Sequence, residues 1–257
     1  MAKGVSIKFK SYSETIPKFL ELIKLNDELK KHNKIVLKIS LKNSASQSNT
    51  NLEFVESVLD FCLMHKNPDS QIVIAEGSDG EDTMELFDKI GYKSLSEKYS
   101  IGLVDLNNAE VAEVENHHFQ KFSSIMYPKI LLESFVISLP TLSLDSETEI
   151  SASLSNMLGA FPSKYYTGFF SSTKNKIRKW PIKYSIHDIL KCKVPDFTIA
   201  DASTQGFVIA GNPLDVDKQA AKILGKEWKS IAHLKLIDER FVPKKDALND
   251  LERSLSL

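Results

Sequence analysis

The chain has 257 residues, of which 42% are apolar and 26% charged, so it can bury a sizeable core. Its 33 basic and 34 acidic residues leave a net charge of −1, which argues against a nucleic-acid binder. Two cysteines, Cys62 and Cys192, are too few for a four-cysteine cluster, and we expect neither an iron–sulfur cluster nor a metal site. No secretion signal or run of 18 apolar residues occurs, so we expect a cytoplasmic protein without membrane contact.

Strand and helix signals alternate through the first half of the chain. Short apolar runs at 5–9, 35–39, 71–75 and 101–105 indicate strands. Apolar residues at helical spacing predict helices over 16–32, 52–63 and 84–90, the last ended by Gly91. This alternation is typical of a parallel sheet with crossover helices.

The second half continues the pattern with strands at 134–138, 197–201 and 207–210. Helical signals lie near 154–158, 188–194 and 215–225, and the charged tail at 238–257 predicts a peripheral helix. The sequence therefore predicts an α/β fold with a mostly parallel, mixed sheet and helices on both faces. No Pro/Gly linker divides the chain, so we expect one domain over 1–257; the alternative is two lobes, 1–125 and 126–257.

Polar residues follow two of the predicted strands, where open α/β sheets bind their ligands. Lys38 ends the second strand beside a polar loop containing Asn43, and it suits a carboxylate or phosphate; the alternative is a lysine reaching solvent along the strand. Glu76-Gly77-Ser78 joins the third strand to a helix whose backbone N–H groups favour an anion. The alternative is a plain turn, because the neighbouring acids repel phosphate.

Residues 150–187 contain no Asp or Glu but many basic and aromatic residues, including Arg178. This mixture suits an anionic ligand with a flat ring, or less well a single nucleic-acid strand. The alternative is a surface loop whose aromatics pack inward. Asp201, at the end of a strand, is a further candidate, whereas Asp217 is expected to be a surface charge in the first turn of a helix.

Several motifs in a fixed order carry a family resemblance, although each alone is weak. They are Val36-Leu37-Lys38, Glu76-Gly77-Ser78, Val104-Asp105-Leu106-Asn107, Ser138-Leu139-Pro140, Leu154-Ser155-Asn156-Met157-Leu158-Gly159, Pro195 to Asp201 and Ala210 to Asp217. In this set the chain resembles the family called domain of unknown function 362 (DUF362). The family's Pro-Lys-x-Lys-Thr-His run is replaced here by Pro140-Thr141-Leu142-Ser143-Leu144-Asp145, and its Lys-Asn by Ser155-Asn156.

The resemblance implies no reaction, and the sequence names no cofactor. Our leading hypothesis is a protein that binds a small anionic metabolite at the strand ends, with catalysis lost along with the missing lysines and histidine. One alternative is an enzyme that uses an external cofactor, with Lys38, Glu76 and Asp201 as acid–base groups. Another is a non-catalytic module that binds a protein partner or a second copy of itself. The candidate ligand-binding residues are Lys38, Asn43, Glu76, Gly77, Ser78, Asn156, Arg178 and Asp201.

Overall fold

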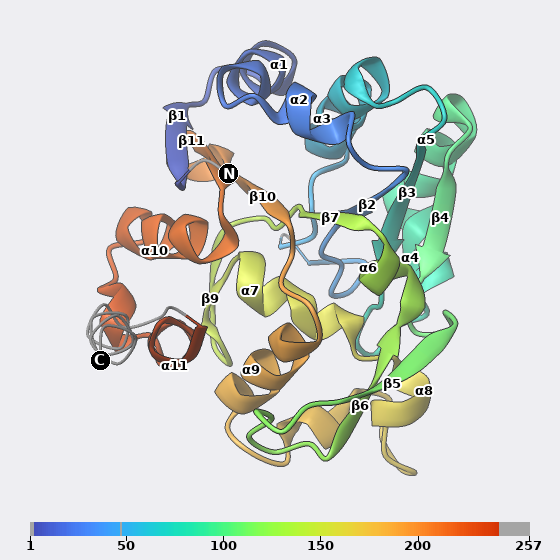
Figure 1. Ribbon diagram of the computed structural model, residues 1–257, viewed down its shortest axis with the longest axis vertical. Helices are drawn as coiled ribbons and strands as arrows, with labels where there is room; N and C mark the ends of the chain where they lie inside the picture. The colour runs from blue at the N-terminus through green and yellow to red at the C-terminus, as the bar shows by residue number, and fades with distance from the viewer. Residues whose placement is uncertain (1–2, 47, 242–257) are drawn as a thin grey trace, which may run out of the picture.

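A seven-stranded sheet forms the centre of the computed structural model, which describes residues 3–46 and 48–241. Its order is β1-β11-β10-β7-β2-β3-β4 (Figure 1). The five strands from β10 to β4 are parallel, whereas β11 is antiparallel to both β10 and β1. The predicted mixed, mostly parallel sheet is confirmed. The strands are β1 (Val5–Lys8), β2 (Lys34–Lys38), β3 (Gln71–Glu76), β4 (Gly102–Asp105), β7 (Phe135–Ser138), β10 (Phe197–Ala202) and β11 (Phe207–Gly211).

One face of the sheet is covered by helices from the first hundred residues. Ile35 and Leu37 of β2 project into this layer, as the alternation of side chains along a strand requires. The single helix predicted over 16–32 is divided in two, because Lys24 adopts a left-handed conformation with φ of 60°. The helices are α1 (Tyr12–Leu22), α2 (Leu25–Leu29), α3 (Leu52–His65), α4 (Thr83–Ile90) and α5 (Tyr92–Tyr99).

The opposite face is covered by helices from the second half of the chain, and Val36 of β2 projects into this second layer. The prediction of helices on both faces is therefore confirmed. The helices are α6 (Lys129–Glu133), α7 (Ser153–Asn156), α8 (Ser163–Tyr166), α9 (Ile182–Cys192), α10 (Pro213–Ile223) and α11 (Ala232–Phe241), with short 3-10 turns η1 (Met157–Ala160), η2 (Asn175–Arg178), η3 (Ser203–Gln205) and η4 (Trp228–Ser230).

Two hairpins outside the main sheet were not predicted. One pairs β5 (Val111–Glu115) with β6 (Ser124–Pro128), and the other pairs β8 (Ser143–Asp145) with β9 (Glu149–Ser151). The helix predicted in the tail is represented only by the end of α11, since 242–257 lie outside the described residues. Over residues 3–46 and 48–241, the structure contains no helix with the length and apolar character needed to cross a membrane.

Candidate functional site

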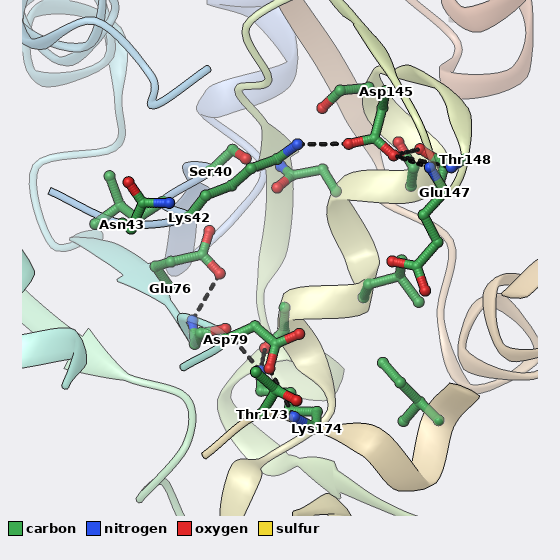
Figure 2. A pocket seen from close by; sticks show the side chains of 18 of the residues that line it. Ser40, Lys42, Asn43, Glu76, Asp79, Asp145, Glu147, Thr148, Thr173 and Lys174 are labelled. Carbon is green, nitrogen blue, oxygen red and sulfur yellow. Dashed lines mark hydrogen bonds and ion pairs between the residues drawn. The ribbon is translucent and has the colours of Figure 1, made fainter. Parts of the chain in front are cut away.

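A cavity of about 400 Å³ opens beyond the carboxyl ends of β2 and β3 (Figure 2). Its wall is assembled from five separate segments of the chain: the loop after β2, the loop after β3, the β8–β9 hairpin, the α7–η1 segment and η2. The lining residues include Ser40, Lys42, Asn43, Glu76, Gly77, Asp79, Asp145, Glu147, Thr148, Asn156, Gly159, Thr173, Lys174 and Arg178. This is the place where open α/β sheets bind ligands.

A buried ion pair lies beneath the cavity. Lys38 Nζ is 2.8 Å from Glu76 Oε2, and their side chains are 0% and 3% exposed. Burial lowers the pKa of Lys38, and the Glu76 carboxylate partly opposes this effect. The remaining Lys38 donors go to the Ile39 carbonyl and to Asn156, while Glu76 Oε1 accepts from the Gly77 N–H at 2.7 Å. Lys38 thus neutralises the chain's own carboxylate.

Two glycines allow the segments around this pair to approach closely. A Cβ atom on Gly159 would lie 2.2 Å from Glu76 Oε1 and 2.8 Å from Lys38 Nζ. A Cβ atom on Gly77 would lie 2.4 Å from the Gly159 carbonyl oxygen. Real Cβ atoms do not approach so closely, so the glycines in the Glu-Gly-Ser and Leu-Gly motifs serve to bring β3 and η1 together.

Lys42 and Arg178 form ion pairs that join separate segments of the cavity wall. Lys42 Nζ reaches across to Asp145 Oδ2 at 2.6 Å, as Figure 2 shows. Arg178 binds both carboxylate oxygens of Glu147, at 2.7 and 3.0 Å, and its Nη1 lies 2.8 Å from Asp79. Burial alone would raise the pKa of Asp145, but hydrogen bonds from Lys42 and the turn backbone outweigh it and hold this pKa well below its usual range.

Lys174 is a third cation in the wall: its backbone N–H donates to Asp79 Oδ1 at 2.6 Å, but its ammonium group contacts no carboxylate among the described residues. Its residue is 1% exposed, and Nζ donates to the carbonyls of Gly77 at 2.7 Å and Gly159 at 3.3 Å. Burial lowers the pKa of Lys174 to about 8, against the attraction of Glu76 and Asp79. Lys174 therefore stays mostly protonated at pH 7 and contributes a positive charge to the cavity wall.

Hydrogen-bond donors remain available on the two lysines. An ammonium group has three N–H donors. Among the described residues, the amine of Lys42 has one acceptor and that of Lys174 has two, which leaves three N–H donors unused between them. Four carboxylates line the same space, from Glu76, Asp79, Asp145 and Glu147. With Lys38 included, four positive charges balance them, so the site is close to neutral.

The structure brings most of the candidate residues to this cavity. Asn43, Glu76, Gly77, Asn156 and Arg178 line it, and Lys38 lies directly behind Glu76.

Two other candidates, Ser78 and Asp201, do not line the cavity. The Ser78 hydroxyl faces Thr83 Oγ1 at 3.0 Å, inside the turn before α4. Asp201 accepts a hydrogen bond from the Tyr12 hydroxyl at 2.9 Å and from the Ser203 N–H at 3.0 Å. The Ser78 side chain therefore holds the turn before α4, and the Asp201 side chain joins the end of β10 to α1.

Two expectations for the surface need correction. Asp217 is not a surface charge: it is 0% exposed and accepts the backbone N–H groups of Ser153 and Leu154, which satisfies the first turn of α7. In the basic, aromatic segment, Phe161 and Tyr166 pack in the core, but Phe169 and Phe170 are 96% and 98% exposed. The aromatic residues of this segment therefore do not all pack inward.

Sequence reasoning did not select Lys42, Asp145 or Lys174 as site residues. Lys42 belongs to the polar loop after β2, and Lys174 to the basic segment, so each had a signal of composition only. Asp145 closes the unpredicted β8–β9 hairpin. Their convergence depends on contacts between residues about 100 positions apart, which no local pattern encodes.

Comparison with solved structures finds the same fold elsewhere. The lactate racemase apoprotein from Thermoanaerobacterium thermosaccharolyticum aligns with a TM-score of 0.59 at 12% identity, over 86% of this chain and 57% of the racemase chain. A structural-genomics protein from Thermotoga maritima aligns with a TM-score of 0.44 at 13% identity, over 73% of this chain and 50% of that one. This chain thus spans 57% and 50% of the two chains, and the likeness to the racemase, at 12% identity, shows the fold alone. A search of curated proteins gave no match.

Comparison with protein families agrees with the ordered motifs. The family described as domain of unknown function (DUF362) matches residues 35–221. This stretch is more than half of the chain and includes every residue that lines the cavity. The chain belongs to the DUF362 family.

Proposed function

We propose that the protein binds a small anionic metabolite in the cavity beyond β2 and β3, and that it acts there as a binding protein. The observation that carries this proposal is the convergence of Lys42, Lys174 and Arg178 on one cavity from separate segments. Hydrogen bonds between an ammonium or guanidinium group and an anion are among the strongest that proteins make. The unused N–H donors of the two lysines supply them without breaking an existing contact.

The charge balance of the wall argues against a ligand with more than two negative charges. Four carboxylates face or border the cavity, and a polyphosphate would meet repulsion from Asp79 and Glu147 at the rim. Lys42 has one acceptor among the described residues, so two of its N–H donors remain for the two oxygens of a carboxylate. A small carboxylic acid is therefore the favoured ligand class.

Acid–base catalysis by Lys38, Glu76 and Asp201 receives less support from the geometry. Lys38 is fully buried, with its donors directed to Glu76, Asn156 and a carbonyl. Asp201 lies outside the cavity wall. A general base must come within hydrogen-bonding distance of the proton that it removes. Of the three residues only Glu76 lines the cavity, and its two oxygens already accept from Lys38 Nζ and the Gly77 N–H.

A partner-binding module is the second candidate, and one observation favours it. Phe169 and Phe170 are almost fully exposed and stack edge to face, with ring centroids 5.0 Å apart. Adjacent exposed aromatics are typical anchors of protein interfaces. If they mediate self-association, the double variant Phe169→Ser/Phe170→Ser should lower the mass measured by sedimentation equilibrium. An unchanged mass would exclude self-association through this pair.

Succinate and inorganic phosphate are suitable probes for the binding proposal, with thermal unfolding as the readout. We expect succinate to raise the melting temperature more than phosphate does at equal ionic strength. Lys42→Ala should weaken succinate binding about tenfold or more, because a charge-assisted hydrogen bond contributes roughly 1.5–3 kcal/mol.

Lys179→Ala is the matched control, since Lys179 is an exposed lysine of the same segment as Arg178 but does not line the cavity. It should bind succinate like the unmodified chain. Equal loss in the two variants, or no response to either probe, would contradict the proposal.

A further inference from the structure

A second cavity of about 330 Å³ adjoins the first. The two share Glu147, Thr148 and Arg178 in their linings, so the bidentate Arg178–Glu147 pair lies at the boundary between them. The side chains of this pair are 35% and 36% exposed. The remaining lining residues are Glu149, Trp180, Pro181, Ile182, Lys183, Ala232 and His233.

His233 supplies an unsatisfied polar atom to this second cavity. The residue is 2% exposed, and its Nε2 forms no hydrogen bond with any residue that the structure describes. Burial lowers the pKa of His233 to about 4, so the imidazole is neutral at pH 7 and Nε2 is available as a hydrogen-bond partner. A buried polar atom without a partner is costly to the fold, and a ligand that pairs with it recovers that cost.

The rest of the second cavity is suited to a flat apolar group. Trp180, Pro181 and Ile182 are among its lining residues. The Trp180 indole is held by an edge-to-face contact with Phe122, with ring centroids 5.8 Å apart. Glu149 is already engaged, since its Oε1 accepts the Ala232 N–H at 3.0 Å. Aromatic rings pack favourably against such indole and proline surfaces.

We propose that the two cavities form one bipartite site for an aryl-substituted carboxylic acid. The acid group binds Lys42 in the first cavity, and the ring lies against Trp180, with a hydroxyl or N–H group of the ring pairing with His233 Nε2. This inference rests on the proposed function, because the first cavity must accept the acid group. It adds the chemical class of the ligand's other end, which the first cavity does not define.

Three related acids test the inference with the full chain in isothermal titration calorimetry: propionate, 3-phenylpropionate and 3-(4-hydroxyphenyl)propionate. We expect affinity to rise in that order. The hydroxyl group should add about tenfold, because one hydrogen bond to a buried, otherwise unpaired atom contributes roughly 1–1.5 kcal/mol. His233→Leu should abolish the tenfold difference between the two aryl acids and leave propionate binding unchanged.

Trp180→Ala is a second variant at a half-buried position, in case the histidine variant folds poorly. It should weaken both aryl acids and spare propionate, whereas His65→Leu, on α3 in the other helical layer, should change nothing. Equal affinity for all three acids would overturn the bipartite site while leaving the proposed function intact. Failure of all three acids and of succinate to bind would overturn both.

Discussion

A buried charge is costly unless it is paired, and the charge of the fully buried Lys38 is paired with Glu76. Removing one partner leaves the other charged and buried. We therefore expect Lys38→Met to lower the free energy of unfolding by about 3–5 kcal/mol, measured by urea titration. The double variant Lys38→Met/Glu76→Gln should recover much of that loss.

An exposed ion pair between the same strand, β2, and the helix α6 provides the control. Lys34 Nζ lies 2.9 Å from Glu133, with side chains 51% and 55% exposed. Lys34→Met should cost less than about 1 kcal/mol, since solvent screens such pairs. Similar losses in Lys34→Met and Lys38→Met would contradict the assignment of Lys38 as a buried structural charge.

The buried carboxyl group of Asp217 should make the stability of the fold depend on pH. Burial raises the pKa of Asp217 to about 7, although the N–H groups of Leu154 and Ser153 oppose the shift. The native state thus binds the proton more tightly than the unfolded chain, in which an aspartate titrates near pH 4. The resulting stabilisation is fully present below about pH 4 and is lost as the pH rises toward 7.

The variant Asp217→Asn should remove this dependence, because the amide does not titrate. We expect the difference in the free energy of unfolding between the two proteins to change steadily between pH 4 and pH 7, and to level off above pH 7. Urea titrations at closely spaced pH values measure that difference. A difference that stays constant with pH would show that Asp217 keeps an ordinary pKa.

At the scale of elements, the contact between β3 and η1 depends on Gly159. Alanine at this position would bring a methyl group within 2.2 Å of Glu76 Oε1, so η1 must move away from the strand. Overpacking of this kind costs roughly 1–3 kcal/mol or more, and here it also separates Asn156 from Lys38. We expect Gly159→Ala to lower the urea midpoint and to weaken succinate binding together.

Gly102→Ala is the comparison for this glycine variant. Its added Cβ would meet the Val73 side chain, with the nearest atom, a methyl carbon, at 3.2 Å, and Gly102 lies in a strand at the edge of the sheet. It should leave succinate binding unchanged. Normal binding and stability in Gly159→Ala would mean that η1 is not held against the ion pair.

The strands of the main sheet could be predicted because burial on both faces leaves nearly continuous apolar runs, as in Ile35-Val36-Leu37. The β8–β9 hairpin could not, since each strand has three residues and both contain an acid. The helix α5 was missed for a similar reason: only Tyr92 and Leu95 of its eight residues are buried.

The candidate site shows the same division between local and long-range information. Lys38 and Glu76 were found because each ends a buried strand, and strand ends meet at one edge of a parallel sheet. The roles of Asp217 and Asp201 were not predictable, because their partners, Ser153 and Tyr12, lie 64 and 189 positions away. A carboxylate at a helix or strand end has the same sequence signature whether it faces solvent or a buried N–H group.

At the scale of the whole molecule, the sheet is shared by two apolar layers. Alternate residues of β2, β7, β10 and β11 enter opposite layers, so each strand belongs to both cores. Cys62 lies in the first layer and is 0% exposed, whereas Cys192 packs on the second and is partly exposed. Burial raises the pKa of both thiols to about 12, so neither should react readily in the native state at pH 8.

The two thiols therefore report separately on the two layers during urea unfolding. We expect both to become reactive toward a maleimide at the same urea concentration, because unfolding one layer exposes the strands on which the other packs. Peptide mass spectrometry after brief labelling at each urea concentration distinguishes the two sites. Labelling of Cys192 at a clearly lower midpoint than Cys62 would instead mean that the layer carrying α7 and the cavity wall opens independently, and the expectation of one domain would then fail.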